Sequence, residues 1–213
     1  MGLQPDGLSQ AQMSEAPLQP STSYAEATRS PYFLAVSAAY LFLLGAQVGA
    51  IAHLYRLVLT RESTHTAAVA LAVLATGSTI GRLVGGALLL RISSYKFGVM
   101  LMAVQAFSLA VLALAQGPAL ILAATALFAV TIGNSLMIHP LLLVERFGTR
   151  DYGRIYATSQ MITVVGVAGC PALVGLLYEI NQGYLMPFLV IAGITLLGLV
   201  TLAAFAVPKR APT

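Results

Sequence analysis

Six long apolar stretches constrain this chain more than any other feature, because each is long enough to cross a lipid bilayer. They lie at about residues 33–55, 66–90, 97–115, 118–144, 155–178 and 184–207. A membrane-spanning helix needs about 20 mainly apolar residues at about 1.5 Å rise each, and every stretch reaches or nearly reaches that length. The sequence therefore predicts an all-α, polytopic membrane protein with a six-helix transmembrane domain at 31–208.

Composition agrees with a bilayer as the surrounding medium. The 213 residues are 58% hydrophobic and only 8% charged, whereas a soluble domain carries roughly a quarter charged residues. The net positive charge comes from few charged residues in total, so it indicates basic loops and no nucleic-acid partner. One cysteine, Cys170, excludes a disulfide framework and a cysteine-based metal site. We expect no metal and no cofactor.

The two ends of the chain lack the apolar pattern. Residues 1–30 are rich in Gln, Ser, Pro and Ala, which predicts a disordered leader. This leader has neither the basic start nor the apolar run of a signal peptide. Residues 209–213 form a short tail.

Basic residues between the stretches predict the orientation. One side would carry Arg29, Arg91, Lys96, Arg146, Arg150, Arg154, Lys209 and Arg210, and the other only Arg56 and Arg61. Because basic loops stay in the cytoplasm, both termini are expected there, in a plasma or inner membrane.

Glycines at four-residue spacing predict helices that approach closely. Gly45 and Gly49 lie in the first stretch, and Gly77, Gly81 and Gly85 form a ladder in the second. Small residues at this spacing let two helix backbones touch in lipid. For the first pair, a chance abundance of glycine remains an alternative.

Arg82 is the only permanently charged residue inside a stretch. A guanidinium stays protonated at any physiological pH and is costly in hydrocarbon, so it predicts a site for a substrate or ion. The alternative is a structural arginine that binds carbonyl groups or extends to the membrane surface. No Asp, Glu or Lys occurs in the other stretches, which favours a mobile partner such as a carboxylate substrate.

Other polar residues inside the stretches are candidates for the lining of a cavity. Tyr40 and Gln47 share one face of the first helix, while Asn134 and Gln160 lie in the fourth and fifth. Each alone is more often an interhelical hydrogen bond than a ligand contact. With Arg82, these four are the predicted substrate-binding residues.

Two histidines lie within the apolar stretches, and the sequence carries no pattern typical of an enzyme. His53 and His139 lie near the ends of stretches and are interpreted as interfacial or helix-end residues, with proton carriage as the alternative. Clustered metal ligands and a serine-hydrolase pattern are both missing from the sequence, so we predict no catalytic residues and no enzyme.

Three segments carry a resemblance to a known family. These are residues 81–91 (GRLVGGALLLR), 143–156 (LVERFGTRDYGRIY) and 169–179 (GCPALVGLLYE) followed by Gly183 and Tyr184. In this order they resemble the C-terminal half of the major facilitator superfamily, and are most similar to its monocarboxylate and oxalate–formate type porters. The resemblance covers about residues 30–208 and implies half of a twelve-helix fold.

The resemblance implies a role for Arg82 and also shows departures. It places Arg82 where such porters have an arginine that helps to bind carboxylates. Leu90 stands where the family usually has an Asp, which removes a gating salt bridge. Residues 155–178 contain no Lys, which argues against a dicarboxylate clamp and for a monoanion or another substrate.

The expected function is therefore transport of a small organic anion, such as a monocarboxylate, by alternating access. Such porters bind substrate between two six-helix halves, so a second half or a homodimer is an expected partner, and proton coupling stays open. The alternative is a truncated or accessory membrane protein without transport activity of its own.

Overall fold

Each predicted apolar stretch forms one long helix. The computed structural model describes residues 22–205, and within them the six long helices are α3 (Pro31–Leu59), α4 (Thr64–Leu89), α5 (Ser94–Leu114), α6 (Pro118–Phe147), α7 (Tyr152–Asn181) and α8 (Leu185–Phe205). All six are long and apolar enough to cross a membrane. Their ends lie within a few residues of the predicted ones, and the predicted all-α class is confirmed.

Local sequence signals begin and end these helices. Ser30 precedes Pro31, and its side chain accepts a hydrogen bond from the Phe33 amide at 3.1 Å. A hydroxyl at this position satisfies one of the free amides of the first turn, and proline fits the first helical residue. Gly117 (φ 80°) and Gly148 (φ 76°) flank α6, and only glycine adopts this backbone region without strain. These residues make the connections short.

The last part of the predicted disordered leader is helical, so that prediction is wrong for these residues. Helix α2 (Tyr24–Arg29) begins with a capping box formed by Ser23 and Glu26. The hydrogen bonds from Ser23 lower the pKa of the Glu26 carboxyl. The Tyr24 amide donates to Asp151 Oδ2 at 2.9 Å, and Arg154 lies over the Tyr24 ring at 4.6 Å. The sequence missed this helix because the partners lie far along the chain. Residues 1–21 and the predicted tail 209–213 lie outside the described residues.

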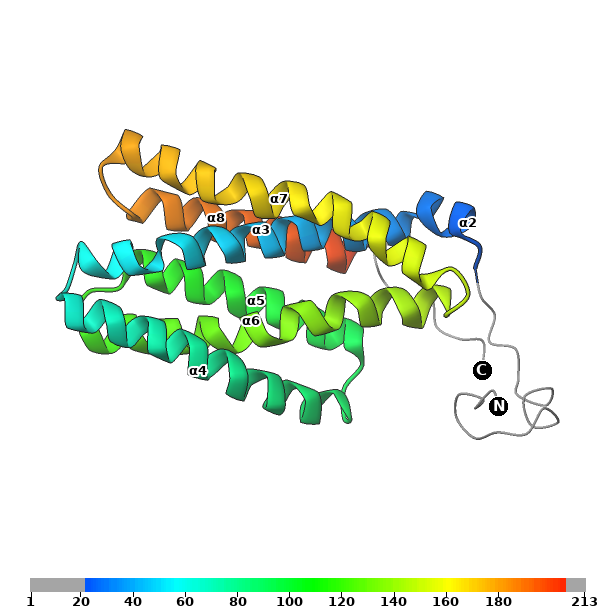
Figure 1. The fold of residues 1–213 in the computed structure, drawn as a ribbon, viewed down its shortest axis with the longest axis horizontal. Coiled ribbons are helices and arrows are strands. Elements are labelled where there is room, and N and C mark those ends of the chain that lie inside the picture. Colours follow the sequence, from blue (N-terminus) through cyan, green and yellow to red (C-terminus); the bar gives the residue numbers. More distant parts are fainter. Residues whose placement is uncertain (1–21, 206–213) are drawn as a thin grey trace, which may run out of the picture.

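The helices run up and down and give the bundle two ends (Figure 1). The basic end carries α2, the α4–α5 turn and the α6–α7 connection, while the opposite end carries the α3–α4, α5–α6 and α7–α8 turns. Of the basic residues predicted to be cytoplasmic, Arg29, Arg91, Lys96, Arg146, Arg150 and Arg154 lie at the basic end. The orientation of this end in a membrane stays a prediction.

Close backbone contact joins α4 to α6 and α3 to α7. A Cβ added to Gly81 would lie 2.7 Å from Val130 Cα, and one added to Gly77 would lie 2.7 Å from Ala129 Cβ. On the other seam, a Cβ on Gly45 would lie 2.9 Å from the Gly166 oxygen. Atoms do not approach so closely, so these positions require glycine. Both predicted glycine motifs therefore mark close packing.

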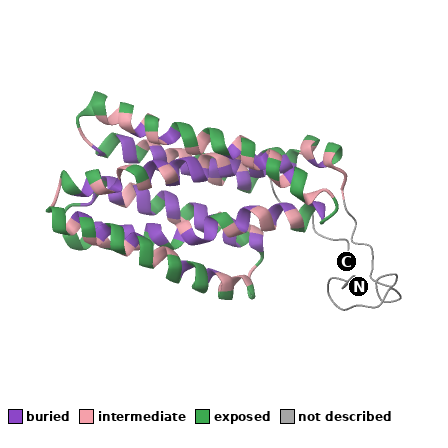
Figure 2. Cartoon of the chain, viewed as in Figure 1, coloured by how far each residue is buried: buried purple, intermediate pink, exposed green. Residues whose placement is uncertain are grey.

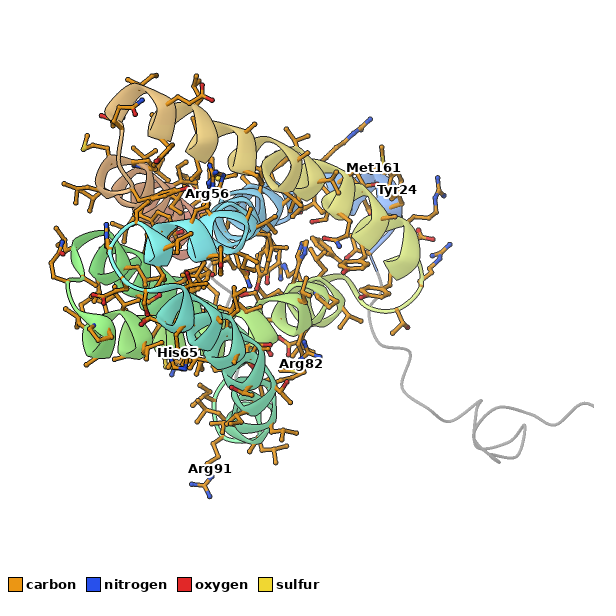
Figure 3. The ribbon with its side chains drawn as sticks, turned by 60° about the vertical axis from the view of Figure 1, so that its left-hand side comes forward. Tyr24, Arg56, His65, Arg82, Arg91 and Met161 are labelled. Atoms are coloured by element: carbon orange, nitrogen blue, oxygen red, sulfur yellow. The ribbon has the colours of Figure 1, made fainter. Side chains whose placement is uncertain are left out.

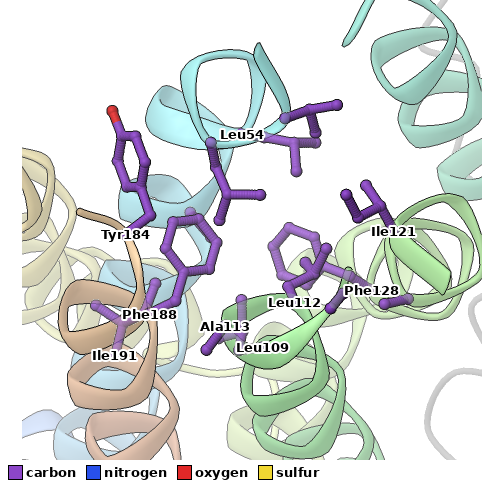
Figure 4. Packing of buried hydrophobic residues seen from close by; sticks show 14 of the residues in the cluster. Leu54, Leu109, Leu112, Ala113, Ile121, Phe128, Tyr184, Phe188 and Ile191 are labelled. Carbon is purple, nitrogen blue, oxygen red and sulfur yellow. The ribbon is translucent and has the colours of Figure 1, made fainter. Parts of the chain in front are cut away.

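Buried apolar side chains fill the bundle in two clusters. The cluster nearer the opposite end contains Leu54, Leu112, Phe128 and Phe188 (Figure 4). Large apolar side chains also lie on the outer surface, where Met161 is 75% exposed, and Figure 2 shows exposed residues along α4 and α7. So much exposed apolar surface is typical of a face that meets lipid or another helix bundle.

Candidate functional site

Arg82 lies on α4 at the middle of the bundle. Its Nε donates to the Gly133 oxygen of α6 at 3.2 Å, and Gly133 is about 21 Å along α6 from each end of that helix. Figure 3 shows Arg82 beside α6, far from Arg91 at the basic end of α4. The Arg82 side chain is exposed. The charge therefore stands at mid-depth on an open surface.

Only one hydrogen bond holds the Arg82 guanidinium. Within residues 22–205, its two Nη atoms form none. The carboxylates of this range lie at or beyond the ends of the long helices, at Glu26, Glu62, Glu145, Asp151 and Glu179. A carbonyl contact was the structural alternative for Arg82, and it occurs. It uses one of five N–H donors, so most of the guanidinium stays available to a ligand.

Asn134 lies beside Arg82 but faces the α4 backbone. Its Nδ2 donates to the Gly81 oxygen and the Val130 oxygen, each at 2.8 Å. The residue is fully buried, and its Oδ1 has no hydrogen-bond partner among the described residues. Gly85 leaves room for this amide, since a Cβ there would overlap Oδ1. Asn134 thus joins α4 to α6 and carries one free acceptor.

Tyr40 packs against a buried histidine. The Tyr40 ring stacks on the His139 imidazole with centroids 4.2 Å apart and planes 11° apart. His139 is 1% exposed, so the prediction that it is interfacial is wrong. It lies directly before Pro140, inside α6. Proline removes one helical hydrogen bond there.

His139 joins α6 to both α3 and α7 through hydroxyl groups. Its Nε2 lies 2.8 Å from Ser159 Oγ of α7, and Ser159 Oγ lies 2.8 Å from Ser37 Oγ of α3. A signal for this group existed in the sequence: Thr131, Ser135 and His139 recur every four residues, which puts them on one face of α6.

The two predicted glutamines also carry free acceptors. Gln160 follows Ser159 and lies beside the imidazole of His139. Its Oε1 is buried without a hydrogen bond to a described residue, as are Oε1 of Gln47 and the hydroxyl of Tyr40. Burying such groups without a partner is costly. They are therefore candidates for contact with a ligand.

The five predicted site residues fall into two groups and one separate position. Arg82 and Asn134 lie together on the α4–α6 seam. Tyr40 and Gln160 lie around His139, which is about 9 Å along α6 from Gly133. Gln47 lies two turns along α3 from Tyr40. The structure shows no hydrogen bond between the two groups in the described part of the chain.

His53 occupies a different setting near the opposite end. Its Nε2 lies 3.1 Å from the Pro171 oxygen and its Nδ1 lies 3.3 Å from the Tyr184 hydroxyl. These contacts tie α3 to α7 and to the α7–α8 turn. His53 lies six residues before the end of α3, so its interpretation as an interfacial or helix-end residue stays a prediction.

A second buried polar network, which the sequence analysis missed, centres on Gln105 of α5. Its Nε2 donates to the Leu43 oxygen at 2.9 Å and to Thr195 Oγ1 at 3.5 Å, while its Oε1 accepts from Thr131 Oγ1 at 3.3 Å. The network joins α3, α5, α6 and α8. Its side-chain groups are all paired, so it holds the bundle together and leaves no group for a ligand.

Comparisons with known proteins identify the fold. No family model and no curated protein matches the sequence. Among solved structures, the chain is similar to the fucose:proton symporter of E. coli, with a TM-score of 0.75 and 16% identity over 87% of this chain and 46% of that one. The chain is thus a multi-pass membrane protein whose six-helix fold is similar to part of this symporter, and it spans less than half of the symporter's length.

Proposed function

We propose that this chain carries a small organic anion, such as a monocarboxylate, across a membrane as one six-helix half of a secondary transporter. The observation that carries the proposal is the exposed guanidinium of Arg82 at mid-depth, with its Nη atoms free. A permanent charge at this depth costs free energy, and such charges are characteristic of substrate pathways. The described part of the chain has no carboxylate at this level, so a mobile anion supplies the countercharge.

The geometry around Arg82 suits a single carboxylate. The bond from Nε to the Gly133 oxygen fixes the plane of the guanidinium. Its remaining donors can bind two carboxylate oxygens side by side, which is the strongest pairing between these groups. Asn134 packs the seam behind it. No second cation lies at this depth in residues 22–205, which favours a monoanion over a dianion.

Transport requires a second six-helix unit in this proposal, and a second copy of the chain takes that place in the uptake experiment. The chain spans 46% of the symporter to which it is similar, and sites of this type lie between two halves. Arg82 is exposed on the α4–α6 surface, so a second half packed there would enclose it. Rocking of the two halves would then expose the anion to each side in turn.

The same coverage supports the alternative function. A chain that spans less than half of a complete symporter can be a truncated or accessory membrane protein, with Arg82 retained without a transport role.

Uptake of radiolabelled lactate by proteoliposomes tests the proposal. The purified full chain is reconstituted as wild type, Arg82→Ala, Arg82→Lys and the control Arg91→Ala, which removes an exposed arginine at the basic end. Hydrogen bonds to charged groups contribute about 1.5–3 kcal/mol, so Arg82→Ala is expected to lower uptake about 10- to 100-fold. Arg82→Lys should retain part of it, because it keeps the charge but not the planar fork.

Two results would contradict the proposal. Equal uptake by Arg82→Ala and wild type removes Arg82 from the anion site. A wild-type chain that is helical by circular dichroism but takes up no lactate favours the accessory function.

A further inference from the structure

Of the described histidines, His139 is the one buried most deeply in the middle of the bundle. It is 1% exposed and lies where α3, α6 and α7 meet. If an imidazole served only to fill space, an apolar side chain could replace it without a loss of stability. Here the ring stacks on Tyr40, meets Tyr156 edge-on and pairs with Ser159, so aromatic and polar groups hold it in place.

Aromatic rings hold the imidazole on two sides. The Tyr40 ring stacks on its face at 4.2 Å, and the Tyr156 ring meets it edge-on at 5.5 Å with planes 67° apart. The electron-rich face of an aromatic ring attracts a cation placed over it. The stack with Tyr40 therefore favours the charged form of the ring more than an aliphatic neighbour would.

Two groups beside the ring can accept hydrogen bonds from an imidazolium. Ser159 partners Nε2 at 2.8 Å. Beside the ring, Gln160 has a buried Oε1 without a hydrogen bond in the described residues. A neutral imidazole has one N–H donor, whereas an imidazolium has two. The Gln160 oxygen is thus free in this structure, and an imidazolium, unlike the neutral ring, can donate to Ser159 and Gln160 at the same time.

We propose that His139 is a proton-binding site, in which Ser159 and Gln160 of α7 accept the two N–H groups of the imidazolium under the ring of Tyr40. The proton comes from water and adds to the free lone pair of the imidazole, and the other groups keep their charges. The assignment of this proton to a transport cycle rests on the proposed function, whereas the binding site itself does not.

Among the described residues, the groups that face the His139 ring carry no charge of their own, so a bound proton is the local charge. Tyr40 from α3 and Tyr156 from α7 are the titratable groups that face it. On α6, Glu145 is about 9 Å further along the axis and accepts a bond from Ser94 of α5, while Arg82 of α4 contacts Gly133 about 9 Å in the other direction. Both acceptors of the imidazolium lie on α7, so proton binding strengthens the contact of α7 with α6.

Nuclear magnetic resonance of the full chain in nanodiscs tests the site without any transport. The described chain contains His53, His65 and His139, so His53→Gln and His65→Gln assign the ring signals by elimination, and His139 itself stays unchanged. The ¹⁵N signals of His139 are expected to pass from the neutral to the doubly protonated pattern as the pH is lowered from about 8 to about 4, a range that extends below the ordinary one of histidine because burial disfavours the charged ring. A His139 signal that keeps the neutral pattern over this range overturns the proposal.

Gln160→Leu separates a built site from a histidine that merely titrates. At the pH where half of the wild-type His139 is protonated, the ratio of protonated to neutral ring is expected to fall about tenfold, the effect of one hydrogen bond to a charged group. The control Gln116→Leu changes an exposed residue of the α5–α6 turn and should leave the ratio unchanged. Equal ratios in Gln160→Leu and wild type contradict the role of Gln160.

The same titration separates the proton site from the proposed function. If His139 becomes protonated in a chain that takes up no lactate, the proton site is supported and the transport proposal is contradicted. If the chain takes up lactate while His139 stays neutral, the transport proposal is supported and the proton site is contradicted.

Discussion

The bundle contains two sets of buried polar side chains that differ in how completely they are paired. The closed network consists of Gln105, Thr131 and Thr195, which bond to one another and to backbone oxygens. The open set consists of Tyr40, Gln47, Asn134 and Gln160, each of which has one buried polar atom without a partner in residues 22–205.

This difference indicates which side of the bundle binds a ligand. Unpaired buried groups lower stability, so a protein that has four of them on α3, α6 and α7 has a use for them beyond packing. The closed network ties α5 and α8 to the other helices, so it forms the fixed part of the bundle against which those helices can move. Variants in the two sets should therefore affect different properties.

The largest effect is expected from Gly81→Ala, which breaks the seam that holds Asn134 of the open set. The new Cβ would lie 2.7 Å from Val130 Cα, so the two backbones must separate and the bond from Asn134 to the Gly81 oxygen is lost. We expect destabilisation of about 3 kcal/mol or more. The control Gly86→Ala meets nothing within 4 Å and should be neutral or gain up to about 1 kcal/mol.

Stability of both variants can be measured through Cys170, the one cysteine of the chain, which is buried. A thiol-reactive dye labels it as the protein unfolds on heating in detergent. Equal unfolding temperatures of Gly81→Ala and Gly86→Ala would show that the α4–α6 seam is loose.

A medium effect is expected from Gln105→Leu, which removes the centre of the closed network. Three side-chain hydrogen bonds are lost, and such bonds between membrane helices contribute about 0.6 kcal/mol each on average. We expect destabilisation of about 1–2 kcal/mol with unchanged substrate affinity, measured by dye labelling and by lactate uptake. Unchanged stability with altered affinity would move Gln105 into the open set.

The smallest effect is expected from Tyr40→Phe. The hydroxyl has no partner among the described residues, so its removal should leave stability unchanged or raise it by up to about 1 kcal/mol, since an unpaired buried group costs free energy. The stack on His139 is retained. A loss of more than about 1 kcal/mol in the free energy of unfolding, measured by dye labelling, would show that the hydroxyl is hydrogen-bonded. Tyr40 would then belong to the closed network.

Much of the fold could be predicted from sequence, because lipid makes length and hydropathy decisive. The six helices and the close contacts of Gly45 and Gly81 follow from patterns within single segments. Helix α2 and the Gln105 network could not be predicted, because their partners come from segments far apart in the chain. For Arg82, the sequence located the charge but not the Gly133 oxygen that holds it.

The candidate site shows the same limit. Its place near the end of an apolar stretch predicted that His139 is interfacial or at a helix end, whereas its ring is buried and α6 continues to Phe147. The burial of the ring depends on Tyr40 and Ser159, which only the packing of three helices brings together. The pattern of one helix could therefore place His139 on a polar face of α6 but could not reveal its partners.

Pro140 divides α6 into two mechanically different segments. Before it, glycine contacts fix the helix to α4 from Ala129 to Asn134. After it, the helix continues to the basic end, with one hydrogen bond fewer at the proline. A bend of α6 is easiest at this point. His139 would then be at the pivot, and Arg82, which is bonded to Gly133 in the fixed segment, would keep its place while the basic end opened or closed.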